Sequence, residues 1–409
     1  MLSELRIDGP RLLARLAELG ECGALEGGGV SRLALTDADK KGRDLVVSWM
    51  RELGLDVSID AIGNITGTRA GATDGPPVMT GSHIDTVRAG GLYDGNLGVL
   101  AGLEMVKTLN DAGITTERPL AVAAFTNEEG ARFAPDMLGS LVFVGGMALQ
   151  DALAVRDGEG AMLGDELERI GYAGSAPVAE SPVHAFVELH IEQGPVLEAE
   201  GVTIGAVRDL QGISWQELVI TGEANHAGTT PMRLRHDAGF AAARVATFLR
   251  ELTLELGGTQ LATAGVIELE PNLINVIASR ARMTVDLRNT DEAALQVAEA
   301  RLMEFTHALA ESEGVGIAAR RLARFEPVVF DAGVHSRIAR VAGELGCSVR
   351  DMTSGAGHDA QMLARICPAA MIFVPSIGGI SHNPAEDTAP EHLAAGANVL
   401  LQTLLELAS

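Results

Sequence analysis

The chain has 409 residues, of which 47% are hydrophobic and 21% are charged, and its formal net charge at pH 7 is −24. This length and apolar content exclude a disordered chain and are sufficient for one large or two smaller packed domains. The negative charge disfavours nucleic acid and anionic membranes as partners, because both repel an acidic protein.

Cysteine usage and the N-terminal sequence indicate the compartment. The three cysteines, Cys22, Cys347 and Cys367, have no paired spacing, which favours a reducing environment over a disulfide scaffold or a Cys-based zinc site. Residues 1–20 carry a charge every few positions and predict an amphipathic helix rather than a signal peptide. No apolar run approaches the ~18 residues that span a bilayer. We therefore expect a cytoplasmic protein without a membrane partner.

The first 210 residues alternate between helical periodicity and short apolar runs. Two of these runs, 78–86 and 120–130, are too apolar for a half-exposed sheet and predict strands covered by helices on both faces. An expected helix at 98–113 separates them, and this order of elements predicts a largely parallel sheet. The elements expected before them are a helix at 39–53 and a strand pair within 55–69 that turns at Gly63-Asn64.

The next segment has a different order of elements. Its patterns follow the sequence β-α-β-β-α-β over residues 211–325, which predicts a small two-layer domain. Asp237 and Thr290 are the expected N-caps of its two helices. The expected elements are strands at 213–223, 261–271, 279–289 and 314–325, and helices at 237–256 and from 290 to about 312.

From Pro327 onward the first pattern returns, with a helix at 335–345, a strand at 369–375 and a final helix at 390–407. The predicted fold class is α/β, with a mixed, largely parallel sheet sandwiched between helices. The predicted domains are a catalytic domain in two parts, 1–210 and 326–409, and an inserted domain, 211–325.

Polar residues with metal-ligand chemistry follow several of the expected strands. His83 ends one strand, the pair Glu128-Glu129 follows the next, and Asp94 lies between a glycine-rich loop and a helix. His190 and His382 follow two further apolar runs. Each has a structural explanation when taken singly: a helix cap for Asp94, a solvated loop for the glutamates, and a hydrogen-bonded core or loop position for each histidine.

Taken together, these residues match the inventory of a two-metal hydrolytic site. They provide imidazole nitrogens, a carboxylate that can bridge, a terminal carboxylate and a further carboxylate that can carry a proton. Open α/β sheets place such sites at the carboxyl ends of their strands. Asp85, two residues after His83, is expected to accept the other ring N–H of that histidine and to fix its tautomer. If these residues gather, the protein is a metallohydrolase.

Eight motifs carry a family resemblance. In chain order they are GSHIDTV, GGLYDGNLGVLAGLE, FTNEEGARF, ELHIEQGPVLE, GEANHAGTTPM, DLRN, SGAGHDA and ISHNPAE. In this order and spacing they resemble the amidase/hydantoinase/carbamoylase family, which is part of the zinc aminoacylase and carboxypeptidase superfamily. The resemblance extends from about residue 20 to the C-terminus.

The resemblance implies two divalent metal ions. The implied ligands are Asp94, His83 and His190 for one ion, and Asp94, Glu129 and His382 for the other. Glu128 would be the general base, which takes a proton from the attacking water and returns it to the leaving nitrogen. The expected metal is Zn²⁺, or Mn²⁺, Co²⁺ or Ni²⁺, because a mixed nitrogen and oxygen ligand set does not discriminate sharply among these ions.

The resemblance also implies that the inserted domain is a lid and dimerisation domain. His226, contributed by the partner subunit of a homodimer, would stabilise the oxyanion; without the resemblance it would be assigned to a loop. Arg288 would bind the substrate carboxylate through its planar fork. It lies on the polar face of its strand, whose other face is apolar. The residues that match further substrate-binding positions are Gln193, Asn275 and His358.

The implied reaction is hydrolysis of an N-carbamoyl-L-amino acid to the amino acid, ammonia and carbon dioxide, so the expected partner is a small ureido carboxylate. β-Ureidopropionase and allantoate amidohydrolase are alternatives within the family. A dipeptidase or aminoacylase is an alternative from another class, against which His190 and Arg288 argue. A non-catalytic binding protein is a third, against which the presence of every metal ligand argues.

Overall fold

The computed structural model describes residues 4–178 and 182–409. By its internal contacts the chain divides into two compact units. The large unit comprises Met1–Arg208 and Phe330–Ser409, and the inserted unit comprises Asp209–Val329. None of the helices in the described ranges is long and apolar enough to cross a membrane.

The large unit is built on a nine-stranded mixed sheet in the order β1-β2-β4-β3-β5-β13-β6-β11, with β12 paired to β6. β3 pairs in parallel with β4 and β5, and β5 pairs in parallel with β13. The pairings of β1, β2, β6 and β11 are antiparallel. The predicted fold class is confirmed, and the parallel part occupies the four central strands. The strands are β1 (Asp56–Ile59), β2 (Ile65–Arg69), β3 (Val78–His83), β4 (Leu120–Phe125), β5 (Ala185–Ile191), β6 (Ile204–Leu210), β11 (Val328–Val329), β12 (Val349–Ser354) and β13 (Ala369–Val374).

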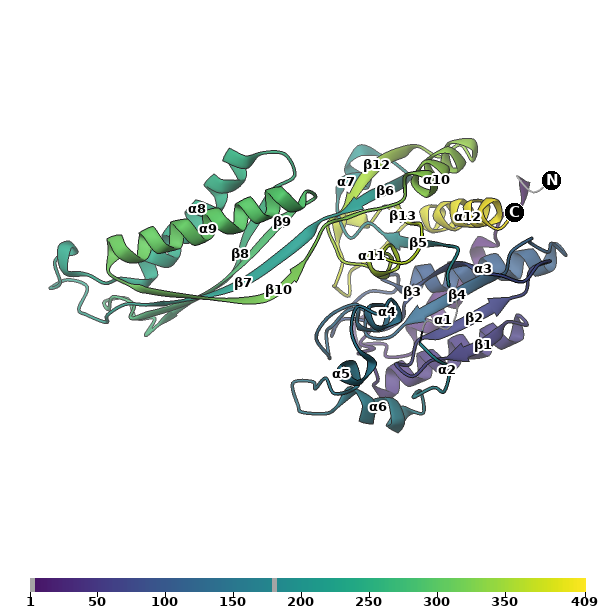
Figure 1. Cartoon of the computed structure of the whole chain (residues 1–409), viewed down its shortest axis with the longest axis horizontal. Coiled ribbons are helices and arrows are strands. Elements are labelled where there is room, and N and C mark those ends of the chain that lie inside the picture. Colours follow the sequence, from purple (N-terminus) through teal and green to yellow (C-terminus); the bar gives the residue numbers. More distant parts are fainter. Residues whose placement is uncertain (1–3, 179–181) are drawn as a thin grey trace. The chain divides into compact units, whose positions relative to one another are not determined.

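Helices enclose this sheet. The four central strands are buried along their whole length, as expected of strands that are covered on both faces. α3 packs on β3, β4 and β5, and α12 packs on β5 and β13 (Figure 1). The helices are α1 (Gly9–Gly20), α2 (Asp37–Glu52), α3 (Asn96–Asp111), α4 (Leu138–Phe143), α5 (Leu149–Leu153), α6 (Leu163–Ile170), α7 (Val196–Glu200), α10 (Ala332–Glu344), α11 (Asp359–Leu363) and α12 (Pro390–Leu407), with a 3₁₀ turn η3 (Ile377–Gly379).

Two glycines bring α3 into direct contact with the sheet. A Cβ at Gly98 would lie 2.7 Å from the carbonyl oxygen of Leu189 on β5, and one at Gly102 would lie 2.9 Å from Thr80 on β3. Both distances are too short for a larger side chain. The start of α3 is therefore held close to the carboxyl ends of β3 and β5, where two of the candidate histidines lie.

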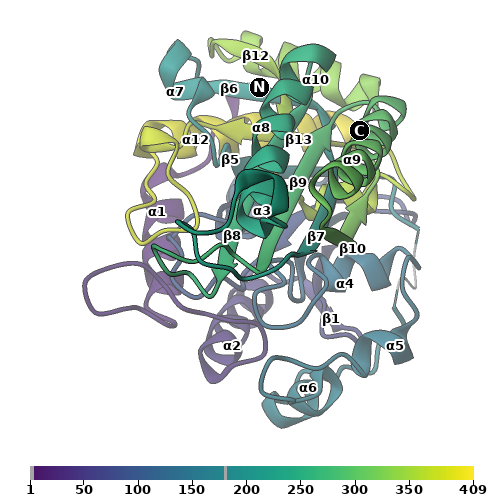
Figure 2. The same cartoon turned by 90° about the vertical axis from the view of Figure 1, so that its left-hand side faces the viewer.

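The inserted unit has the predicted β-α-β-β-α-β order, and its four strands form one antiparallel sheet in the order β10-β7-β9-β8. Figures 1 and 2 show α8 and α9 together on one face of this sheet. The apolar residues of β9 are buried against these helices, as its alternating sequence predicts. The elements are β7 (Gly212–Thr221), the 3₁₀ turn η2 (Met232–Leu234), α8 (Ala238–Leu256), β8 (Leu261–Glu270), β9 (Arg280–Asn289), α9 (Glu292–Glu313) and β10 (Gly316–Phe325).

One predicted helix cap is wrong. α9 is capped by Asp291, whose Oδ1 accepts a hydrogen bond from the N–H of Ala294 at 2.7 Å. The hydroxyl of Thr290 lies 2.8 Å from that of Thr259 instead. Both residues have the chemistry of an N-cap, and the contact with Thr259, which is 31 positions earlier, decides between them. The prediction for Asp237 at the start of α8 is confirmed.

Candidate active site

His83 and Asp94 lie at the two ends of the loop between β3 and α3. The N-cap residue of α3 is Gly95, and it makes no side-chain capping bond, so Asp94 does not cap this helix. Gly95 has a φ of 68°, and a Cβ there would lie 2.4 Å from the His83 ring. Glycine is therefore required at position 95, both for the backbone conformation and for the close approach of the ring.

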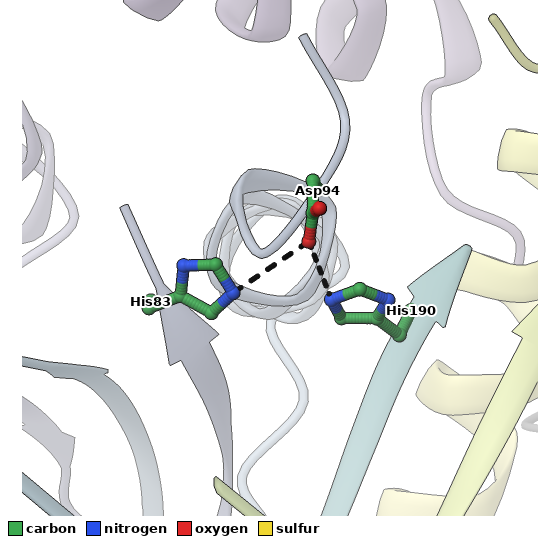
Figure 3. Close-up of side chains that lie close together, drawn as sticks. All are labelled: His83, Asp94 and His190. Atoms are coloured by element: carbon green, nitrogen blue, oxygen red, sulfur yellow. Dashed lines mark ion pairs between the residues drawn. The ribbon is translucent and has the colours of Figure 1, made fainter. Parts of the chain in front are cut away.

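The Asp94 carboxylate faces two groups of side chains. Its Oδ1 lies 3.1 Å from Nε2 of His190 and 3.7 Å from Nε2 of His83. Figure 3 shows Asp94 at the start of α3, between His83 at the end of β3 and His190 on β5. Its Oδ2 lies 3.3 Å from Nε2 of His382. One carboxylate thus presents one oxygen to each group.

Glu129 completes the second group. Its Oε2 lies 3.4 Å from Nε2 of His382, which is in the loop after η3. The ligand atoms of each group lie within 4.8 Å of one another. The first group is His83, Asp94 and His190, and the second is Asp94, Glu129 and His382. The structure therefore brings together five residues that are spread over 300 positions of the sequence.

Glu128 lies beside the first group without belonging to either one. Its Oε2 is 3.3 Å from Nε2 of His83, and its side chain is buried. The predicted contact between the Asp85 carboxylate and the ring of His83 is wrong. The ring Nδ1 of His83 contacts the main-chain carbonyl oxygen of Asp85, at 2.9 Å, and not its carboxylate. That carboxylate accepts the backbone N–H groups of Glu128 and Glu129, at 3.2 and 3.4 Å, and so holds both glutamates in place.

Burial and mutual repulsion dominate the electrostatics of these groups. Burial raises the pKa of Glu128 and of Glu129 well above the usual range, and neighbouring carboxylates raise both further. Burial acts to raise the pKa of Asp94, but hydrogen bonds with His190 and His382 outweigh it and hold that pKa well below its usual value. Burial lowers the pKa of His83 to about 4. The ionised forms of the two glutamates are therefore unfavourable in this buried region.

The donor atoms of the cluster fit divalent cations. Imidazole nitrogens combined with carboxylate oxygens are the ligand set of zinc and of related first-row ions. A nearby cation would offset the burial and the repulsion that raise the pKa values of the glutamates. Asp94, His83 and His190 would hold one ion, and Asp94, Glu129 and His382 would hold another.

Two further predicted residues of the large unit lie beside this cluster. Gln193 places its Nε2 3.0 Å from Oδ2 of Asp94 and 3.3 Å from Nε2 of His382. His358 is buried, with its ring centroid 4.5 Å from that of His190. Within the described residues, neither Oε1 of Gln193 nor Nε2 of His358 has a hydrogen-bond partner. Both are buried polar atoms whose hydrogen-bonding capacity is not used by the described residues.

The other three predicted residues belong to the inserted unit. The segments that carry His226 and Asn275 are paired, because the N–H of Ala227 donates to the carbonyl of Asn275 at 2.9 Å. Arg288 lies on the polar face of β9, and its Nε and Nη2 donate to the Asp286 carboxylate at 2.8 to 3.1 Å. The inserted unit thus presents an imidazole, an amide and an oriented guanidinium.

Sequence reasoning did not assign a role to Glu386, which joins two of the loops in the site. Its Oε1 accepts the N–H groups of Tyr93 and Asp94, each at 3.2 Å, and its Oε2 accepts the hydroxyl of Ser381 at 3.0 Å. A signal was present, because Glu386 closes the ISHNPAE motif four residues after His382.

The sequence matches the model of a family described as peptidase family M20/M25/M40 over residues 79–406. The chain belongs to this family. It is 44% identical over 404 residues to an N-carbamoyl-L-amino-acid amidohydrolase of Rhizobium meliloti, covering 98% of this chain and 97% of that protein. It is 36% identical over 394 residues to the allantoate amidohydrolase of Bacillus subtilis (strain 168), covering 95% of each.

The structure is similar to the crystal structure of an amidase of the hydantoinase/carbamoylase family from Burkholderia multivorans, with a TM-score of 0.96 and 47% identity over 99% of this chain and 98% of that one. The family predicted from the motifs is therefore confirmed. Members of the M20 family are metal-dependent hydrolases, and the donor groups around Asp94 can hold a metal. This M20 protein is accordingly an enzyme that hydrolyses amide C–N bonds.

Proposed function

We propose that the protein hydrolyses N-carbamoyl-L-amino acids to the free amino acid, ammonia and carbon dioxide, and that it uses two divalent cations. The observation that carries the proposal is the Asp94 carboxylate, which presents one oxygen to each of two groups of metal-ligand side chains. The 44% identity to a relative named for this reaction supports the choice of substrate.

Cations held by the two groups would act as Lewis acids, lowering the pKa of a water from 15.7 towards ~7 and polarising the carbonyl. The proposed metal is Zn²⁺, with Mn²⁺, Co²⁺ and Ni²⁺ as alternatives. Glu128 takes a proton from the attacking water and delivers it to the leaving nitrogen. Its position 3.3 Å from His83, outside both donor groups, leaves its carboxylate for proton transfer.

Residues of both units are proposed to recognise the substrate. His226 donates a hydrogen bond to the oxygen of the tetrahedral intermediate, and Asn275 and Gln193 bind polar groups of the substrate. His358 of the large unit is proposed as a further substrate-binding residue. The inserted unit is a lid and dimerisation domain in this proposal, and His226 comes from the partner of a homodimer.

The proposed location is the cytoplasm. The three cysteines are free, in keeping with a cytoplasmic location.

Arg288 is proposed to bind the substrate carboxylate, and the change Arg288→Lys tests this role. Lysine keeps the charge but loses the planar fork, so the loss of a charge-assisted bond worth about 1.5 kcal/mol raises KM about tenfold. The change in KM is measured by steady-state kinetics with a carbamoyl amino acid as substrate. The matched control is Arg282→Lys, since Arg282 lies on the same face of β9 and pairs with Glu217. Equal KM values for both variants and the wild type would show that Arg288 does not bind the substrate carboxylate.

The substrate is tested by a panel assayed with metal-reconstituted enzyme. The panel contains N-carbamoyl-L-α-amino acids, 3-ureidopropionate, allantoate and a dipeptide. We expect the highest kcat/KM for a carbamoyl-L-α-amino acid, because Arg288 is proposed to bind the α-carboxylate. A higher value for ureidopropionate or allantoate would assign the protein to that reaction instead, and a higher value for the dipeptide would replace the amidohydrolase proposal by a peptidase.

A further inference from the structure

Arg32 is a fully buried residue in the segment before α2, and its guanidinium group makes four hydrogen bonds. The acceptors are the carbonyl oxygen of Ile84 (2.6 Å), the carbonyl oxygens of Leu19 (2.8 Å) and Cys22 (2.7 Å), and Oδ1 of Asn96 (2.8 Å). Within the described part of the chain, all four acceptors are neutral oxygens. A buried cation without a directly bonded carboxylate is costly, and these four hydrogen bonds offset part of that cost.

The contacts of Arg32 frame the loop that carries two candidate metal ligands. Ile84 directly follows His83, and Asn96, the first residue of α3, lies two positions after Asp94. One planar group is thus bonded to both ends of the segment that sets the distance between His83 and Asp94. Two acceptors at fixed positions suit the rigid fork of arginine and cannot both be reached in the same geometry by the single ammonium of lysine.

The backbone around Arg32 reinforces this attachment. The N–H of Arg32 donates to Oγ1 of Thr86 at 2.8 Å, and the N–H of Thr86 donates to the carbonyl of Arg32 at 3.0 Å. Val30 and Gly90 exchange two backbone hydrogen bonds, at 3.0 and 2.9 Å. Residues 30–32 therefore lie along the loop and bond it at its start, its middle and its end.

We propose that Arg32 is a positioning residue that preorganises His83 and Asp94 for cation binding and so sets the metal affinity of the site. This inference rests on the proposed metal site. Groups that orient metal ligands from outside typically change metal affinity by about 10–100-fold when they are replaced. Arg32 orients the two ligands through their neighbours in the chain, so its replacement loosens the pair without removing either ligand.

The test is the affinity of the metal-depleted full-length protein for Mn²⁺. This ion binds most weakly in its series, which brings the Kd into the range of direct titration. Free Mn²⁺ is followed by electron paramagnetic resonance, and the fold of each metal-depleted variant is checked by circular dichroism and thermal unfolding. We expect Arg32→Lys to raise the Kd about 10–100-fold. Asn96→Ala, which keeps the arginine and removes one acceptor, is expected to raise the Kd by a smaller factor.

Arg69→Lys is the matched control. Arg69 donates to Oδ1 of Asn110 and to the carbonyl of Ile114, so it makes the same kinds of contact at the other end of α3. Asn110 lies fourteen positions after Asn96, which corresponds to about 21 Å along the helix. The control is expected to lower the unfolding temperature while leaving the Kd within about twofold of wild type.

Each outcome assigns the failure to one proposal. If the wild type does not bind Mn²⁺, the proposed metal site fails. If the wild type binds and Arg32→Lys binds equally well, the positioning role of Arg32 is wrong. Where Arg32→Lys does not fold, Asn96→Ala decides, because a wild-type Kd for that variant contradicts the proposal and a raised Kd supports it.

Discussion

Replacing Glu128 with Gln is expected to lower kcat by about 10²–10⁴-fold, the usual contribution of general acid–base catalysis, without releasing bound metal. Glutamine keeps the size of the buried side chain but cannot accept the proton of the attacking water. Glu128 lies 3.3 Å from His83 and belongs to neither group of ligand atoms, so the affinity for metal has no reason to fall. Turnover of a carbamoyl amino acid and metal per chain by mass spectrometry are measured on the same sample.

Glu129→Gln is the control, because the two glutamates are adjacent, both are held by the Asp85 carboxylate, and only Glu129 faces His382. We expect this variant to lose one ion per chain. If Glu128→Gln loses metal and keeps partial activity while Glu129→Gln keeps its metal, the two roles have been assigned the wrong way round.

The sequence predicted the central strands of the sheet because burial leaves a clear pattern, but it did not predict the peripheral strands β6, β11 and β12. The runs that became β3 and β4 are apolar on both faces, and the structure buries both strands completely. The alternation along β9 predicted which of its faces meets the helices of the inserted unit. These predictions depend on periodicity along one segment, and no contact distant in the chain opposed them.

Features that depend on distant contacts were not predictable in the same way. The choice of Asp291 over Thr290 as a cap depends on Thr259, and the Asp85 carboxylate faces the backbone of two glutamates more than 40 positions later. Arg32 gave no signal at all, since an arginine followed by apolar residues is common. Its partners Ile84 and Asn96 are over 50 residues away.

The candidate metal ligands were only partly predictable from the sequence. Residue type and position at a strand end suggested each of them, but the sequence could not exclude a cap for Asp94 or a solvated loop for the glutamates. The structure removes the first explanation by placing Gly95 at the cap, and the second by burying Glu128. The motifs added the order and spacing of these residues along the whole chain. The family that this order and spacing predicted is confirmed by the comparison with known proteins.

Asp94→Asn is expected to abolish measurable turnover and to reduce the bound metal from the two proposed ions to at most one per chain. Asparagine has nearly the same shape, but only one of its two terminal atoms is an oxygen, and its amide N–H groups face a cation unfavourably. Because Oδ1 of Asp94 faces His83 and His190 while Oδ2 faces His382, one group must lose its shared ligand whichever way the amide is oriented. Metal per chain is measured by mass spectrometry after dialysis, together with turnover.

Glu104→Gln separates this effect from the general cost of altering a buried acid. Glu104 is also buried, lies on α3 ten residues after Asp94, and pairs with Arg11. Its replacement breaks that pair and is expected to lower the unfolding temperature while both ions remain bound. The proposed bridging role of Asp94 predicts the opposite result for Asp94→Asn, which loses metal even where its unfolding temperature is unchanged. Two ions retained in Asp94→Asn would show that each group binds without a shared carboxylate, and the two-metal arrangement would then need a different bridge.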